Sequence, residues 1–215
     1  MEIGITKLTD IDLLRKCAGY TTGKDCKMSL AAAYRHHHSL IRSQIFLIEL
    51  RNIPLFVASQ FVRSHVGVQF FQRSKRTDRG GENFEDVCNA IADNMERCAN
   101  DNCDWSDICE RDIQRVRNLP NRFDRYAPTD LAFIINAEAI LNMAHKRLCT
   151  KASKETREIW QAVCGALKDI DPDLHKHLVP MCVFRGGICG EPQCCGYNKT
   201  ESFKAKLDIY KSLFE

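Results

Sequence analysis

The sequence lacks a strong charge of either sign, a long hydrophobic run and a cleavable leader. Its 215 residues carry 31 Lys and Arg against 28 Asp and Glu, so a net charge of +3 gives no reason to expect a nucleic acid or a membrane as partner. The longest apolar runs, such as Ile45 to Ile48, are far shorter than a membrane-spanning helix. The first residues lack the basic start and apolar stretch of a secretion signal, so we expect a cytoplasmic protein. Composition, with 44% hydrophobic and 27% charged residues, indicates a soluble globular protein with a real core.

The chain also lacks internal repeats and low-complexity tracts, so we predict a single domain over residues 1–215 with a Cys-rich tail at about 180–197. The β-branched run 44–50 predicts a buried strand that Pro54 ends. Helices are expected over most of 1–43, over 55–62, over 82–118 with a break at 100–104, and over 153–170, where Ser153 is a suitable N-cap. Residues 67–79 read as a loop or strand, and the segment from Pro180 reads as irregular.

The strongest helical pattern covers residues 130–149, whose apolar residues fall within one sector of about 120°. Asn136 and Arg147 lie about 20° apart around such a helix and flank one side of this stripe, while Asn142 flanks the other. Asn is a poor residue for a helix interior, because its side chain competes for backbone hydrogen bonds. The two Asn are therefore either semi-exposed fillers or parts of a site.

The stretch from Gln60 to Arg76 is rich in hydrogen-bond donors, and its basic members are Arg63, Arg73, Lys75 and Arg76. Arg offers a planar fork of donors that suits a phosphate or a carboxylate, although a solvated basic loop would have the same composition. Neither a P-loop nor a Gly-x-Gly-x-x-Gly turn accompanies it, so a nucleotide site here would be built from side chains. His36, His37 and His38 cannot all reach one metal, so we expect one of them to face a pocket instead.

Together these residues resemble the flavin-dependent thymidylate synthases. The family signature, Arg-His-Arg-x-x-Ser-x-Asn-x-x-Ser-x-Arg, is similar to the stretch that begins Arg63-Ser64-His65 and ends Ser74-Lys75-Arg76, although its central Ser and Asn are missing here. His38 and Gln60 match a His and a Gln that precede the signature. The late-helix pattern of the family matches Asn136-Ala137, Asn142 and Arg147 without gaps.

The resemblance implies an α/β (α+β) fold with a mainly antiparallel sheet flanked by helices, and an FAD-dependent methyltransferase and oxidoreductase of nucleotide biosynthesis. It implies reductive methylation of dUMP to dTMP, with methylenetetrahydrofolate and NADPH as co-substrates and with active sites shared in a homotetramer. The residues that it places at FAD are His38, Arg63, His65, Asn136 and Asn142. Those that it places at dUMP are Gln60, Gln72, Ser74, Arg76, Arg125 and Arg147, of which Arg147 is also expected to act in catalysis; Arg122 is the second choice for the position of Arg125.

The altered signature leaves related chemistry open, such as hydroxymethyl transfer or a cytosine base. A rival from another class is a zinc-stabilised module that binds nucleic acid through residues 63–79, although the near-neutral charge makes nucleic acid an unexpected partner. Twelve cysteines without a secretion signal indicate reduced thiols. Among them, Cys182, Cys189, Cys194 and Cys195 are separated by glycines and a proline, as in thiolate-bound zinc, but the spacing is not a repeated Cys-x-x-Cys pair. Reduced thiols are the first expectation for this cluster, with zinc ligands and a disulfide as the alternatives.

Overall fold

The computed structural model describes residues 1–73, 84–100, 110–119, 125 and 127–215. Its strands are β1 (Glu2–Lys7), β2 (Ile45–Pro54), β3 (Val68–Gln72) and β4 (Pro128–Asn136). The helices before β4 are α1 (Ile11–Thr22), α2 (Leu30–Arg35), the 3-10 helix η1 (Ser39–Ser43), α3 (Leu55–Phe61), α4 (Phe84–Asn100) and α5 (Glu110–Arg117). Those after β4 are α7 (Ala137–Arg147), α8 (Lys154–Ile170), α9 (Pro172–Lys176), α10 (Met181–Phe184), the 3-10 helix η4 (Tyr197–Lys199) and α11 (Glu201–Lys211). In these residues we find no helix with the length and apolar character that crossing a membrane requires.

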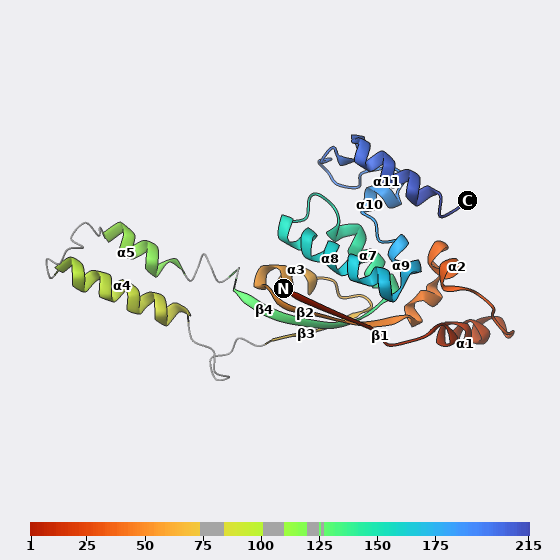
Figure 1. Cartoon of the computed structure of the whole chain (residues 1–215), viewed down its shortest axis with the longest axis horizontal. Coiled ribbons are helices and arrows are strands. Elements are labelled where there is room, and N and C mark those ends of the chain that lie inside the picture. The colour runs from red at the N-terminus through yellow and green to blue at the C-terminus, as the bar shows by residue number, and fades with distance from the viewer. Residues whose placement is uncertain (74–83, 101–109, 120–124, 126) are drawn as a thin grey trace.

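The strands form one antiparallel sheet in the order β1-β2-β4-β3. Helices α3, α7 and α8 cover one of its faces (Figure 1). Side chains alternate between the two faces of a strand, and the register places Phe46 opposite Ile135 and Ile48 opposite Phe133 on the covered face. These four side chains are at most 1% exposed, so the core lies between this face and the helices. The predicted antiparallel sheet flanked by helices is confirmed.

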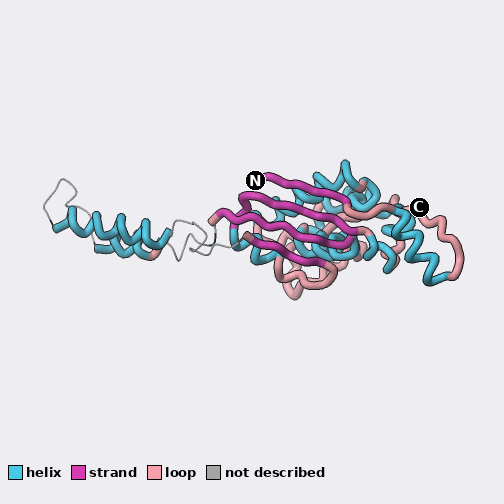
Figure 2. The backbone as a smooth tube through the Cα atoms, turned by 90° about the horizontal axis from the view of Figure 1, so that it is seen from below, coloured by secondary structure: helices cyan, strands magenta, loops and turns pink. Residues whose placement is uncertain are grey.

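The opposite face of the sheet is open, as the view from below shows (Figure 2). The register brings Leu47, Ile134 and Gln69 side by side on this face, next to the Ala132–Phe71 pair. Ile134 is 39% exposed and Phe71 is 54% exposed. The sheet therefore presents apolar side chains on the side that the helices do not cover.

Helices α4 and α5 lie side by side, away from the sheet and its helices (Figure 1). Arg117 joins them, because its guanidinium lies 3.0 Å from an Asp93 carboxylate oxygen and 2.8 Å from one of Glu96. Because this pair of helices stands apart from the sheet, the assignment of residues 1–215 to one domain stays a prediction.

The predicted helix over 130–149 is wrong in its first half. Residues up to Asn136 belong to β4, which is central in the sheet, and only Ala137–Arg147 are helical. In β4, every second residue points to the core, namely Leu131, Phe133 and Ile135. Because the strand runs directly into α7, these residues and the apolar residues of the helix together fit one helical stripe. Asn136 is consequently the N-cap of α7 and not a residue of its interior.

Two further predictions need correction. Residues 1–43 contain β1, in which Ile3 and Ile5 lie opposite Leu50 and Ile48 of β2 on the core side. The segment after Pro180 is not irregular throughout, since it contains α10 and α11. Thr200 caps α11, whose buried Phe203 and Tyr210 form a second small core with Val179 and Val183 of the preceding segment. The predicted elements at 44–50, 55–62, 82–118 and 153–170 are confirmed as β2, α3, the α4–α5 pair and α8.

Candidate functional site

Arg147 and Gln60 meet where the last turn of α7 reaches the end of α3. One terminal nitrogen of Arg147 donates to Gln60 Oε1 at 3.3 Å, and the other donates to the backbone carbonyl of Gln60. Both residues are half-buried. The structure thus brings together two residues that are far apart in the sequence and that the family resemblance places at the same substrate.

The remaining nitrogen of Arg147 has no hydrogen-bond partner among the described residues. Its Nε is fully buried without a hydrogen bond, and burial together with the nearby charge of Arg63 lowers the pKa of Arg147. An unpaired buried donor costs about 1–3 kcal/mol. An anion or a carbonyl oxygen bound beside Arg147 would satisfy this donor and offset the repulsion from Arg63.

Asn136 has a structural role in addition to the predicted one. Its side chain caps α7 by accepting a hydrogen bond from the Ala139 N–H at 2.9 Å, and its own N–H donates to the Gly67 carbonyl at 2.9 Å. Gly67 has a φ of +74°, and a Cβ there would lie 2.5 Å from Asn136 Nδ2. Only glycine fits this close approach without strain. Gly67 follows His65 closely and was not among the residues selected from the sequence.

Arg125 also reaches α3. Its guanidinium carbon lies 4.5 Å from the centre of the Phe56 ring, and Phe56 lies one helical turn before Gln60 in α3. Stacking of this kind holds the plane of a guanidinium against an aromatic ring. Arg125 and Arg147 therefore both contact α3, the helix that carries Gln60.

The other predicted residues are less closely assembled. His38 is exposed and caps η1, with its Nδ1 accepting the N–H of Leu40 at 3.3 Å. Arg63, His65, Gln72 and Asn142 are exposed, and across the part of the chain that is described no hydrogen bond or ion pair ties His65, Gln72 or Asn142 to Arg147. Ser74, Arg76 and Arg122 lie outside the described residues.

A group of buried imidazoles lies beside α7. The ring of His37 is 6.3 Å from that of His145 and 6.3 Å from that of His177, and His145 and His177 are 3% and 4% exposed. Burial, followed by the charge of His37, lowers the pKa of His145 to about 4 and that of His177 to about 4. His37 is the member of the His36–His38 run that turns inward, but no sequence signal pointed to His145 or His177.

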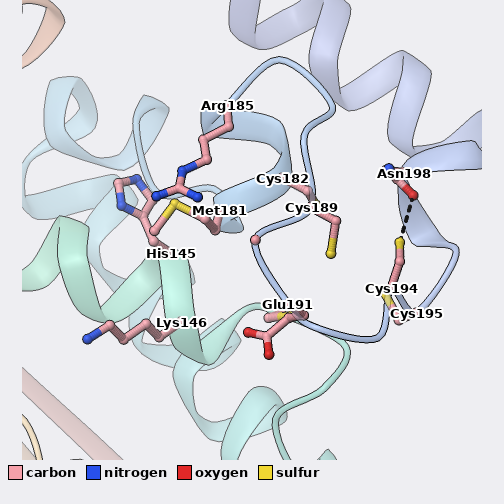
Figure 3. A pocket seen from close by; sticks show the side chains of 12 residues that line it. His145, Lys146, Met181, Cys182, Arg185, Cys189, Glu191, Cys194, Cys195 and Asn198 are labelled. Atoms are coloured by element: carbon pink, nitrogen blue, oxygen red, sulfur yellow. Dashed lines mark hydrogen bonds between the residues drawn. The ribbon is translucent and has the colours of Figure 1, made fainter.

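The cysteine candidates gather at a cavity of about 240 Å³ between the end of α7 and the C-terminal segment (Figure 3). Cys182, Cys189, Cys194 and Cys195 all line it, and all four are free thiols. Among the described side chains no group of three or more His, Cys, Asp or Glu is already arranged to hold a metal ion.

Comparison with known structures agrees with the fold. A crystal structure of thymidylate synthase X from Helicobacter pylori with FAD and dUMP superposes with a TM-score of 0.53 at 17% identity, over 83% of this chain and 99% of that one. A second structure of the Helicobacter pylori enzyme, also complexed with FAD and dUMP, gives 0.52 at 16% identity, over 83% of this chain and 100% of that one.

A flavin-dependent thymidylate synthase from Clostridium tetani is 28% identical over 88 residues, which are 40% of this chain and 34% of that protein. The chain thus spans about a third of the length of this curated relative. The family model for the thymidylate synthase complementing protein, Thy1, matches residues 21–173, which include α3, the whole of α7 and every residue predicted to bind FAD or dUMP. Most of the chain matches this model, and the chain belongs to the Thy1 family.

Proposed function

We propose that the protein is a flavin-dependent thymidylate synthase, which converts dUMP to dTMP. Methylenetetrahydrofolate supplies the carbon, and NADPH supplies the reducing equivalents. Bound FAD supplies the redox chemistry of the reaction. Family membership and the FAD and dUMP bound in the Helicobacter pylori structures support this assignment.

The single observation that carries the proposal is the environment of Arg147. A half-buried guanidinium with an unpartnered Nε, close to Arg63 and fixed by Gln60, suits a dianionic nucleotide with ring carbonyls. In this role Arg147 holds the pyrimidine and stabilises the negative charge that develops on it, because a preorganised donor needs no reorientation during the reaction. Gln60 orients Arg147 and offers its amide to the same base.

The remaining residues take the roles that family resemblance gives them. Arg125, Arg76, Ser74 and Gln72 contribute donors to the nucleotide, with the two Arg side chains suited to its phosphate. His38, Arg63, His65, Asn136 and Asn142 belong to the flavin side. None of the twelve cysteines acts as a nucleophile in this scheme.

We further propose that the active sites form between subunits of a homotetramer. His38, Gln72 and Asn142 are exposed, and within the described chain no hydrogen bond or ion pair ties them to Arg147. Side chains from a neighbouring copy would complete a site of this kind. The open sheet face around Ile134 and Phe71 offers an apolar surface for that association.

The test is a visible absorption spectrum of the purified protein after addition of FAD, gel filtration and then dUMP. We expect a flavin band that stays with the protein and changes with dUMP. Incubation with methylenetetrahydrofolate and NADPH should then yield dTMP, identified by chromatography against dTMP, hydroxymethyl-dUMP and methylated dCMP standards. A colourless protein that fails to bind added FAD would contradict the proposal, and one of the other two products would replace the assigned reaction.

A further inference from the structure

Five thiols from three separate parts of the chain surround the cavity at the end of α7 (Figure 3). Cys149 follows α7, Cys182 belongs to α10, and Cys189, Cys194 and Cys195 lie in the loop that leads to η4. None of them is in a disulfide. Free cysteines usually pack singly as small hydrophobic residues, so five in one partly open cavity indicate a chemical role.

Polar groups interact with the loop sulfurs. The N–H of Gly196 donates to Cys194 Sγ at 3.4 Å. The side chain of Thr150 and the backbone of Tyr197 interact with Cys195, and the backbone of Glu191 interacts with Cys189. Donors of this kind stabilise a thiolate and orient it as a metal ligand, which is the role of the groups that surround metal-bound residues.

The loop has little else to hold it. None of the residues 185–196 is buried, and Ile188, its one large aliphatic side chain, is 68% exposed. The C-terminal core beside the loop has four buried residues in the described chain, Val179, Val183, Phe203 and Tyr210, with Cys182, Tyr197, Leu207 and Leu213 partly buried against them. A segment with so small a core is typically stabilised by a metal or by cross-links.

We propose that Cys149, Cys182, Cys189 and Cys195 bind one zinc ion, which fixes the C-terminal segment to the end of α7. Four thiolates suit zinc because it is tetrahedral, prefers sulfur and has no redox chemistry of its own. Lys146 and Arg185 line the same cavity and offset the excess negative charge of a zinc ion with four thiolates. Among the described side chains no group is arranged to hold a metal ion, so the proposed binding requires the loop to move toward Cys149.

Cys194 is excluded from the ligand set by its own contacts. Its Sγ donates to Asn198 Oδ1 at 3.3 Å, and Figure 3 shows it turned toward that side chain. Cys149 lies two residues after Arg147, so the zinc ion would immobilise the end of the helix that presents the proposed substrate ligand.

The test measures metal in the full-length protein, purified with a reductant and without chelators after growth with added zinc. We expect about one zinc ion per chain by plasma mass spectrometry, as for other closed structural sites. Replacement of the zinc by cobalt(II) should give the intense near-ultraviolet charge-transfer band of thiolate ligands. C182S and C189S should lose the zinc, whereas C194S and C17S should retain it; Cys17 lies in α1 and does not line the cavity.

These readouts do not depend on flavin or on turnover, so they separate this proposal from the enzymatic one. If C182S or C189S is insoluble, the cobalt spectrum of the wild-type protein still decides. Wild-type protein without zinc and without a cobalt–thiolate band would overturn the proposal. So would zinc retained in C189S, or a disulfide found among these cysteines by mass spectrometry of the freshly purified protein.

Discussion

The guanidinium of Arg147 donates to both oxygens of Gln60, the side-chain oxygen at 3.3 Å and the backbone carbonyl. One residue of α3 therefore fixes the side chain that ends α7. Arg147 approaches the proposed substrate with its direction already set and with one buried nitrogen, Nε, still unpaired. This arrangement leads to the first prediction.

Arg147→Ala should lose dUMP affinity and keep FAD. Hydrogen bonds to a charged group contribute about 1.5–3 kcal/mol, so the dissociation constant for dUMP should rise about 10- to 150-fold. Isothermal titration with dUMP on the FAD-loaded protein measures this change. Lys146→Ala is the matched control, since Lys146 is the exposed neighbour on the same helix turn and should leave dUMP affinity unchanged. Equal affinity in the two variants would show that Arg147 does not hold the nucleotide.

Gly67→Ala should destabilise the protein by about 1–3 kcal/mol, because a Cβ at a φ of +74° is strained and would collide with Asn136. Urea unfolding followed by circular dichroism measures the effect. Gly165→Ala, in the exposed interior of α8 with no atom within 4 Å of the added Cβ, should instead stabilise the protein by up to about 1 kcal/mol. If both variants were destabilised by the same amount, the contact of the new Cβ with Asn136 would not be the cause of the destabilisation in Gly67→Ala.

Asp171→Ala should be costly, because this carboxylate joins three elements. It lies 2.6 Å from the ammonium of Lys7, accepts the hydroxyl of Tyr34 at 2.8 Å, and caps α9. We expect the free energy of unfolding to fall by roughly 3 kcal/mol. This is the lower end for breaking a buried ion pair, because the Lys7 side chain is 19% exposed. Asp173→Ala breaks only an exposed pair with Lys176, so its loss should stay below about 1 kcal/mol in the same unfolding assay.

Acidification should destabilise the protein between about pH 6.5 and pH 4. Burial lowers the pKa of His145 and of His177 from 6.5 to about 4 in the folded state, so the unfolded chain binds more protons in this interval. Stability from the neutral imidazoles is complete above pH 6.5 and is lost as the pH falls through this range, on the order of 3 kcal/mol for each residue.

Urea unfolding at pH 7.5 and pH 5 checks this dependence. His177→Gln should reduce the difference between the two pH values, whereas the exposed His36→Gln should not. An unchanged difference in His177→Gln would assign the pH dependence to other groups.

Much of this architecture is readable from the sequence where one physical signal dominates. The β-branched run before Pro54 predicts β2, and Ser153 with Glu155 predicts the start of α8. Prediction from the sequence fails where a strand passes directly into a helix, because β4 and α7 together place apolar residues at spacings that fit one long helix. Asn136, which caps α7, lies at the boundary, but the periodicity of the flanking residues conceals the change from strand to helix.

The residues of the candidate site were also only partly predictable from the sequence. Arg147, Gln60 and Asn136 were identified through family patterns, and the structure explains how two of them come into contact. Gly67 and the buried pair His145 and His177 were missed, because a close backbone approach and a burial site depend on segments distant in sequence. The cysteines of the tail were visible as a cluster, but Cys149 joins them only through folding.

The adjacency of β3 and β4 in the sheet has a topological consequence. These strands are antiparallel partners, with Gln72 opposite Leu131, so the chain leaves the sheet at one edge and re-enters it beside the point of departure. The segment between β3 and β4, which includes α4 and α5, is a long insertion in the connection of a β-hairpin. Its length can change by insertion or deletion without altering the register of the sheet, so we expect relatives to differ in size here while the frame that carries Arg147 stays constant.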